Sequence, residues 1–353
     1  MVYLKMIRIM LGKARNIFLN LLLLTISLLG SLLFLEYSFR FYLRSRYDRQ
    51  IAKYQHSLFK IERNSLLEMS MIPNLQKVNK IEGNPEGTWS YTINNDGYRG
   101  KNIAREKADG VKRIMFLGDS YTFGWGIDDD ETYPEQLKLI LRNNNDFNVE
   151  VINLGIPGYN TIQESELLRE NIHLFNPDVV VLAYVMNDAE HQMNVPLSPG
   201  VKYKLAYSWV CEFFKDFLNT KFPNICHFAV NIQKNEPYLI GFKHNNPKWK
   251  ESKKALKSMV SLCNKRHIAF VVVILPDFTQ RFDESYRYKY IHHSVTEWCK
   301  EFNVDSIDLL PNFLGTDHKK LWVIGEGHPN EIAHQMIAEI LSGYLKGILD
   351  KRM

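Results

Sequence analysis

The sequence lacks most of the features that would place it in a specialised class of protein. It has no internal repeat, no low-complexity tract and no group of histidine, cysteine and acidic residues at metal-ligand spacing. We therefore predict no metal and no cofactor. Cysteine is scarce too, and we expect either one or two disulfides in an extracytoplasmic domain or buried free thiols. The four cysteines are Cys211, Cys226, Cys263 and Cys299.

Net positive charge is lacking outside the N-terminal region. The net charge is +5, yet residues 1–63 hold eleven Lys and Arg against three Asp and Glu, so the rest of the chain is slightly acidic. Nucleic-acid binding requires a basic patch on the folded domain, and this distribution gives no support to it, so we expect no nucleic-acid partner. A basic N-terminal segment instead suits the anionic head groups of a membrane.

Long hydrophobic runs are absent with one exception, from Ile17 to Leu35. A helix of about 19 residues just crosses a hydrocarbon core of about 30 Å. No small-residue cleavage site follows the run. We therefore predict a transmembrane helix over residues 16–36 after a short basic tail over residues 1–15, with a cleaved signal peptide and a buried helix as alternatives. Lys and Arg flank both ends, so charge does not decide the orientation.

Short apolar runs alternate with amphipathic stretches over residues 106–350. The runs predict strands at 114–117, 149–154, 177–184, 268–275 and 304–309, and the stretches predict helices at 132–141, 164–174, 249–266, 288–302 and 331–345. Strict alternation indicates an α/β domain, a doubly wound parallel sheet of about five strands with helices on both faces. The first helix is expected to open with a capping box from Thr132 to Glu135.

Two segments depart from this alternation. Residues 41–79 alternate at roughly helical spacing and predict a membrane-proximal stalk within residues 37–105, which ends in a strand-like stretch and an Asn95-Asp96-Gly97 turn. Residues from about 189 to 247 show no strand pattern and are rich in aromatic residues. We expect a helical insertion that caps the site or, alternatively, an elaboration without substrate contact.

A residue suited to catalysis follows each of the first three predicted strands. Ser120 ends the first in Gly118-Asp119-Ser120, Gly158 follows the second, and Asn187 follows the third, while His328 stands near the C-terminus. The carboxyl ends of parallel strands are where open α/β sheets bind ligands. Acyl transfer by serine needs a nucleophile, a base, a group that orients the base, and oxyanion donors.

These four segments resemble the sequence blocks of the SGNH (GDSL) hydrolases, over about residues 113–345. The resemblance implies a three-layer, flavodoxin-like fold with Ser120 as nucleophile and His328 as general base. It also implies that the N–H groups of Ser120 and Gly158 and the amide of Asn187 form the oxyanion hole. The anchor and the Asn95–Arg99 segment are similar to membrane-anchored members, which implies a catalytic domain outside the cytoplasm.

The sequence departs from the family pattern in two places. The family usually has Asp three residues before the histidine, where this chain has Gly325. Glu326 is the nearest carboxylate and is expected to orient His328, with a serine–histidine dyad as the alternative and Asp317 in reserve. The third block lacks its usual glycine and has Tyr184-Val185-Met186 in its place.

Other notable residues have structural explanations. Asp119 and Asp188 are expected to hold their turns, and Gly155 is expected to be a packing residue. The run Asp128–Glu131 lacks the ligand spacing of a calcium loop. We therefore interpret it as negative charge at the start of a helix.

The sequence thus predicts a membrane-anchored serine esterase. Its substrate would be an acyl or acetyl ester on a glycan or a lipid, and its partners this substrate and the membrane. Two alternatives remain: an O-acyltransferase that acts on a cell-surface polysaccharide with the same residues, and a non-catalytic SGNH-fold binding domain.

Overall fold

The computed structural model contains two compact units, Met1–Ser57 and Leu58–Met353. It describes residues 3, 13, 15–27, 30–31, 34, 37–38, 58–62, 66–67, 69–81, 84–143, 147–189, 242, 246–323 and 327–351. Most of the predicted insertion from about 189 to 247 lies outside the described residues. So do Cys211, Cys226 and Glu326.

In the first unit, residues 15–27 are helical and their apolar side chains are exposed, among them Phe18 and Leu23. A search of the described residues found no helix that is both long and apolar enough to cross a membrane. Several positions of the predicted transmembrane helix over 16–36 lie outside the described residues. The anchor therefore remains a prediction.

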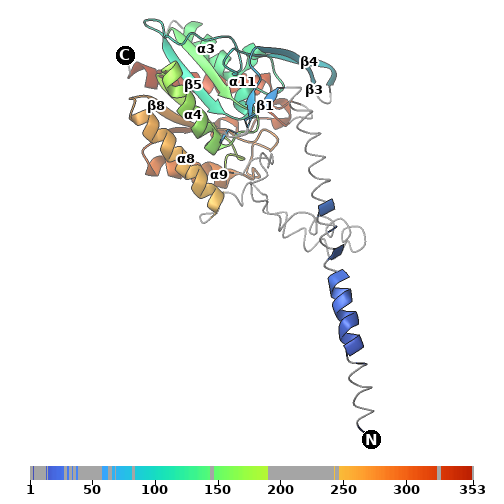
Figure 1. The fold of residues 1–353 in the computed structure, drawn as a ribbon. Helices are drawn as coiled ribbons and strands as arrows, with labels where there is room; N and C mark the ends of the chain where they lie inside the picture. Colours follow the sequence, from blue (N-terminus) through green and yellow to red (C-terminus); the bar gives the residue numbers. More distant parts are fainter. Residues whose placement is uncertain are drawn as a thin grey trace. The chain divides into compact units, whose positions relative to one another are not determined.

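The second unit is built on the predicted parallel sheet (Figure 1). Its strand order is β6-β5-β7-β8-β9, and every neighbouring pair is parallel. The continuous apolar runs of β5, β7 and β8 are buried, as expected of strands covered on both faces. The strands are β5 (Lys112–Gly118), β6 (Val149–Gly155), β7 (Val179–Tyr184), β8 (Ala269–Ile274) and β9 (Asp305–Asp308).

Helices cover both faces of this sheet. The connection from β5 to β6 moves toward one edge of the sheet, and the connection from β6 to β7 moves toward the other edge. Right-handed crossovers therefore place their helices, α3 and α4, on opposite faces. In the two layers, α3 packs against α11 and α4 against α8. The main helices are α3 (Tyr133–Asn143), α4 (Thr161–Phe175), α8 (Pro247–Asn264), α9 (Lys289–Glu301) and α11 (Glu331–Asp350). The predicted doubly wound fold is confirmed.

The strand order creates a switch point between β5 and β7. A crevice forms at the carboxyl ends of the strands where successive crossovers leave in opposite directions. Ser120 follows β5 as the first residue of the short helix α2 (Ser120–Phe123), and Asn187 lies in the turn after β7. The topology therefore places both residues at this crevice.

The described residues between 58 and 79 correct the helical prediction for 41–79, and residues 41–57 lie outside the described part of the chain. Residues 59–61, 69–71 and 75–79 are extended, in β1 (Phe59–Ile61), β2 (Met69–Met71) and β3 (Leu75–Ile81). β3 pairs with β4 (Asn84–Ile93), in which Trp89, Tyr91 and Ile93 alternate into the core. A short polar–apolar alternation is compatible with the period of a helix and with that of a strand. Here the burial of alternate β4 side chains favours the strand. The strand predicted before Asn95 is confirmed.

The start of α3 also differs from the prediction. The hydroxyl of Thr132 donates to the carbonyl of Asp129 at 3.1 Å instead of capping α3. His334 of α11 acts in its place and accepts from the N–H of Tyr133 at 3.0 Å. The capping box lies one turn earlier, where Asp128 and Glu131 cap the N-terminus of the 3-10 helix η1 (Asp129–Glu131). The interpretation of the acidic run as helix-start charge is confirmed.

Two of the four cysteines are described, and neither forms a disulfide. Cys263 and Cys299 are buried. Burial raises the pKa of the Cys299 thiol to about 11, so this group is a packing element and not a nucleophile. For these two residues, the structure favours buried thiols over disulfides.

Candidate active site

The candidate nucleophile stands on a tight turn between β5 and α2. The carboxylate of Asp119 accepts from the N–H of Tyr121 at 2.8 Å and so caps α2. The N–H groups of Gly124 and Trp125 both donate to the carbonyl of Ser120 at 3.0 Å and close the turn. Ser120 is the first helical residue, so α2 offers its N–H no acceptor. Among the described residues, no backbone carbonyl outside α2 accepts from that N–H.

The structure brings Ser120 and His328 together although 208 positions separate them in the chain. The Ser120 Oγ lies 2.9 Å from His328 Nε2. His328 is held in the turn before α11, where its carbonyl accepts from the N–H of Val323 at 2.8 Å. The rings of Tyr121 and Trp125 lie beside this histidine, with centroids 5.8 and 6.3 Å from that of the His328 ring. An imidazole this close can take the serine proton.

Two further predicted residues offer donors at the same edge of the sheet. Gly158 lies in the turn after β6 with φ of +85°, a conformation that favours glycine. Its N–H donates to no other described residue. The Asn187 Nδ2 donates to Asp119 Oδ2 at 3.0 Å. An amide nitrogen carries two hydrogens, so the second remains for a substrate oxygen.

Asp119 links the nucleophile turn to Asn187, which the sequence did not indicate. Its carboxylate is buried and accepts from both Tyr121 and Asn187. Burial raises the pKa of Asp119 above its usual range, and these two hydrogen bonds oppose the rise. The predicted turn-forming role is confirmed. The contact with Asn187 depends on β5 and β7 being neighbours, and no signal in the chain order gives it.

The loop that carries Asn187 is fixed by buried acidic groups. Asp188 Oδ2 accepts from the N–H of Val185 at 2.6 Å, which confirms that Asp188 holds its loop. Glu164 of α4 lies beside Asp188 and is fully buried. Burial, followed by the charge of Asp188, raises the pKa of Glu164 well above its usual range. Burial, followed by the charge of Asp119, raises the pKa of Asp188 in the same direction.

The bulky third block leaves room for Asn187 because two of its side chains face the core. Tyr184 and Val185 are buried, and the Tyr184 hydroxyl lies 2.9 Å from Ser252 Oγ of α8. Gly155 is needed for close packing, as expected. A Cβ at this position would lie 2.2 Å from the backbone nitrogen of Phe123.

The acid that orients His328 was assigned to Glu326, which lies outside the described residues. The reserve candidate, Asp317, is used elsewhere. Its carboxylate accepts from the N–H of Lys319 at 3.2 Å and caps the 3-10 helix η3 (His318–Lys320). Within the described part of the chain, no group of three His, Cys, Asp or Glu side chains could hold a metal ion.

The sequence matches the model of the GDSL-like Lipase/Acylhydrolase family over residues 116–336. The chain belongs to this family. It is therefore a serine ester hydrolase of the SGNH (GDSL) type. The matched range contains Ser120, Gly158, Asn187 and His328.

Solved structures of low identity resemble the chain. A putative lipolytic protein of the G-D-S-L family from Desulfitobacterium hafniense DCB-2 is 14% identical, with 65% of this chain and 98% of that chain covered and a TM-score of 0.41. The esterase EstA from Pseudoalteromonas sp. is 15% identical, with coverage of 68% and 99% and a TM-score of 0.43. An acetyl xylan esterase is 16% identical, with coverage of 66% and 98% and a TM-score of 0.40. No curated protein matches the chain.

Proposed function

We propose that the enzyme hydrolyses an acyl or acetyl ester on a glycan or a lipid, with Ser120 as nucleophile and His328 as general base. The observation that carries this proposal is the distance of 2.9 Å between Ser120 Oγ and His328 Nε2. Serine is a weak nucleophile until a base takes its proton. This contact supplies that base at the switch point of the sheet.

In the proposed cycle, His328 takes the proton of Ser120 as the serine oxygen attacks the ester carbonyl. The N–H groups of Ser120 and Gly158 and the second amide hydrogen of Asn187 hold the oxyanion. His328 then protonates the leaving alcohol, and an acyl group remains on Ser120. Water attacks this acyl-enzyme, again with His328 as base, and releases the carboxylic acid.

Glu326 is the proposed group that orients the imidazole of His328. It stands two residues before the histidine, and the carboxylate of Asp317 is already used to cap η3. A carboxylate at this place would stabilise the imidazolium that forms when Ser120 loses its proton. Without it, Ser120 and His328 act as a dyad.

The membrane-anchored arrangement is likewise proposed. It is supported by the apolar run from Ile17 to Leu35, by the exposed apolar side chains of residues 15–27, and by the basic residues on both sides of the run. An anchored enzyme whose domain lies outside the cytoplasm meets acylated glycans and lipids at the cell surface. These are the substrate classes we propose.

A fluorophosphonate probe tests the nucleophile. This reagent phosphonylates a serine only where a neighbouring base activates it. The full-length protein should be labelled, and the Ser120→Ala and His328→Ala proteins should not. A panel of short acyl esters and acetylated sugars, with and without an alcohol acceptor, then separates hydrolysis from acyl transfer. A folded full-length protein that takes no label would contradict the proposal and favour the binding domain.

A further inference from the structure

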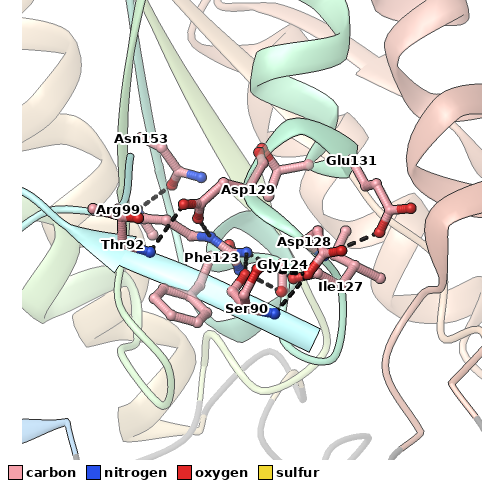
Figure 2. Close-up of polar contacts among 12 residues, drawn as sticks. Ser90, Thr92, Arg99, Phe123, Gly124, Ile127, Asp128, Asp129, Glu131 and Asn153 are labelled. Atoms are coloured by element: carbon pink, nitrogen blue, oxygen red, sulfur yellow. Dashed lines mark hydrogen bonds and ion pairs between the residues drawn. The ribbon is translucent and has the colours of Figure 1, made fainter. Parts of the chain in front are cut away.

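Arg99 is a buried cation that joins the β3–β4 hairpin to the nucleophile turn (Figure 2). Its Nε donates to Asp129 Oδ1 at 2.8 Å. Its Nη1 donates to the carbonyls of Phe123 and Gly124 at 2.8 and 2.5 Å. Its Nη2 donates to the carbonyls of Ile127 and Ser90 at 2.7 and 3.3 Å.

These contacts are unusually complete for one side chain. Only 4% of Arg99 is exposed, and a buried charge is tolerated where its hydrogen bonds are satisfied. Each of the three guanidinium nitrogens has at least one acceptor. The guanidinium carbon also lies 4.7 Å from the centroid of the Phe123 ring, which adds a cation–π contact. The planar fork of arginine fits this set of acceptors, and an ammonium group cannot.

The acceptors belong to the turn that carries Ser120. The last carbonyls of a helix lack partners within it. Arg99 donates to the carbonyls of Phe123, the last residue of α2, and of Gly124, its C-cap. The N–H of Gly124 in turn donates to the carbonyl of Ser120. A displacement at Gly124 is therefore passed directly to Ser120.

The other side of Arg99 faces the hairpin. Asp128 Oδ1 accepts from the N–H of Ser90 at 2.6 Å, and Asp129 Oδ2 accepts from that of Thr92 at 2.9 Å. The two carboxylates thus take the place of a neighbouring strand along the edge of β4. The backbone of Arg99 forms bridges to Ile93 of β4 and to Asn153 of β6.

We propose that Arg99 is a positioning residue of the hydrolase, which makes the β3–β4 hairpin part of the apparatus that holds Ser120 within reach of His328. The inference rests on the proposed function, because it assumes that the contact between Ser120 and His328 is the reactive one. Arg99 precedes residue 116, where the family match begins. The proposed role therefore belongs to a residue outside the matched range.

The test is Arg99→Lys in the full-length chain, with Arg113→Lys as the matched control. Arg113 is also buried and donates to a carboxylate, Glu150, and to carbonyls that include Phe175. It lies at the opposite end of β5 from Ser120. Both variants lose a buried guanidinium. Only the first loses it at the nucleophile turn.

We expect Arg99→Lys to lower kcat for an ester substrate, and the rate of fluorophosphonate labelling, by roughly 10²-fold, the usual effect of a reacting group displaced by about 1 Å. KM should change little, because Arg99 does not touch the substrate. Arg113→Lys should lower Tm and leave kcat at the wild-type value. A folded Arg99→Lys protein with the kcat of the control would overturn the inference.

Asp129→Asn provides the measurement if Arg99→Lys does not fold. Asp129 is partly exposed, and its carboxylate joins Arg99 to Thr92. A fall in kcat at unchanged KM supports the inference, and an unchanged kcat overturns it. The wild-type protein separates the two claims. If it takes no label, the proposed function fails together with the inference. If it labels and the variants keep its rate, only the inference fails.

Discussion

At the scale of single residues, chain position explains where the site lies but not how its side chains are held. Ser120, Gly158 and Asn187 could be selected because each follows an apolar strand. The contact between Asp119 and Asn187 could not be selected, because it depends on which strands are neighbours and on the direction of two side chains. The structure makes Asp119 the acceptor that fixes one hydrogen of the Asn187 amide.

This geometry predicts that Asn187→Ala lowers kcat by about 10²–10³-fold, the usual loss for one oxyanion donor. The side chain contributes its second amide hydrogen only when the oxyanion forms, so KM should change little. Steady-state kinetics with a short acyl ester would measure both values, and thermal unfolding would show that the protein is folded.

Asn171→Ala is the matched control for this prediction. Asn171 is a buried asparagine of α4, and its Nδ2 donates to the carbonyl of Leu167 at 2.8 Å. Its loss should lower Tm and leave kcat unchanged. Equal kcat values in folded Asn187→Ala and wild-type proteins would remove Asn187 from the oxyanion hole.

At the scale of helices and strands, an element can be predicted from the sequence when its own residues carry the complete signal. The strands β5, β7 and β8 could be predicted because their apolar runs are continuous and buried. The segment 59–79 was mistaken for a helix because its short alternation gains meaning only from pairing, in β3 with β4. The start of α3 was misassigned for a similar reason. Its cap is His334, which lies about 200 positions away on another helix.

The cap of α3 gives a prediction about pH. Burial lowers the pKa of His334 from its usual 6.5 to about 3. Between these values the unfolded chain binds a proton that the folded protein does not, so stability falls as pH is lowered from about 6.5 toward about 3. The loss reaches at most about 1.4 kcal/mol per pH unit. His334→Asn keeps an acceptor for the N–H of Tyr133 and should flatten this dependence.

Urea unfolding between pH 4 and pH 7 would measure this effect as the difference between variant and wild-type free energies of unfolding. His293→Asn is the control, because its side chain is exposed on α9. We expect the free-energy difference for His334→Asn to shift in favour of the variant as pH falls. Parallel curves for His334→Asn and wild type would show that His334 does not carry this acid sensitivity.

At the scale of the whole molecule, the site and the elements that support it belong to one unit. Leu58–Met353 contains the sheet, the β3–β4 hairpin and the contact between Ser120 and His328. The family match covers only residues 116–336 of this unit. The matched range therefore omits the hairpin and Arg99, both of which contact the nucleophile turn.

Two truncations test which residues before the matched range the hydrolase requires for stability and labelling. Removal of residues 1–53 should release the protein from membranes and leave its Tm and fluorophosphonate labelling rate unchanged, because the proposed anchor lies outside the unit. Removal of residues 1–105 should abolish labelling. It deletes Arg99 and leaves the carbonyls of Phe123 and Gly124 without the donors that hold α2. It also removes Trp89 and Tyr91 from the aromatic cluster around Phe123.

Membrane fractionation and labelling of both truncated proteins would give the answer. A 54–353 protein that still sediments with membranes would contradict the anchor and leave the hydrolase intact. A 106–353 protein that labels at the wild-type rate would show that residues 116–336, with their immediate flanks, position Ser120 unaided. The β3–β4 hairpin would then be an attachment to the hydrolase domain, and the role of Arg99 would be lost with it.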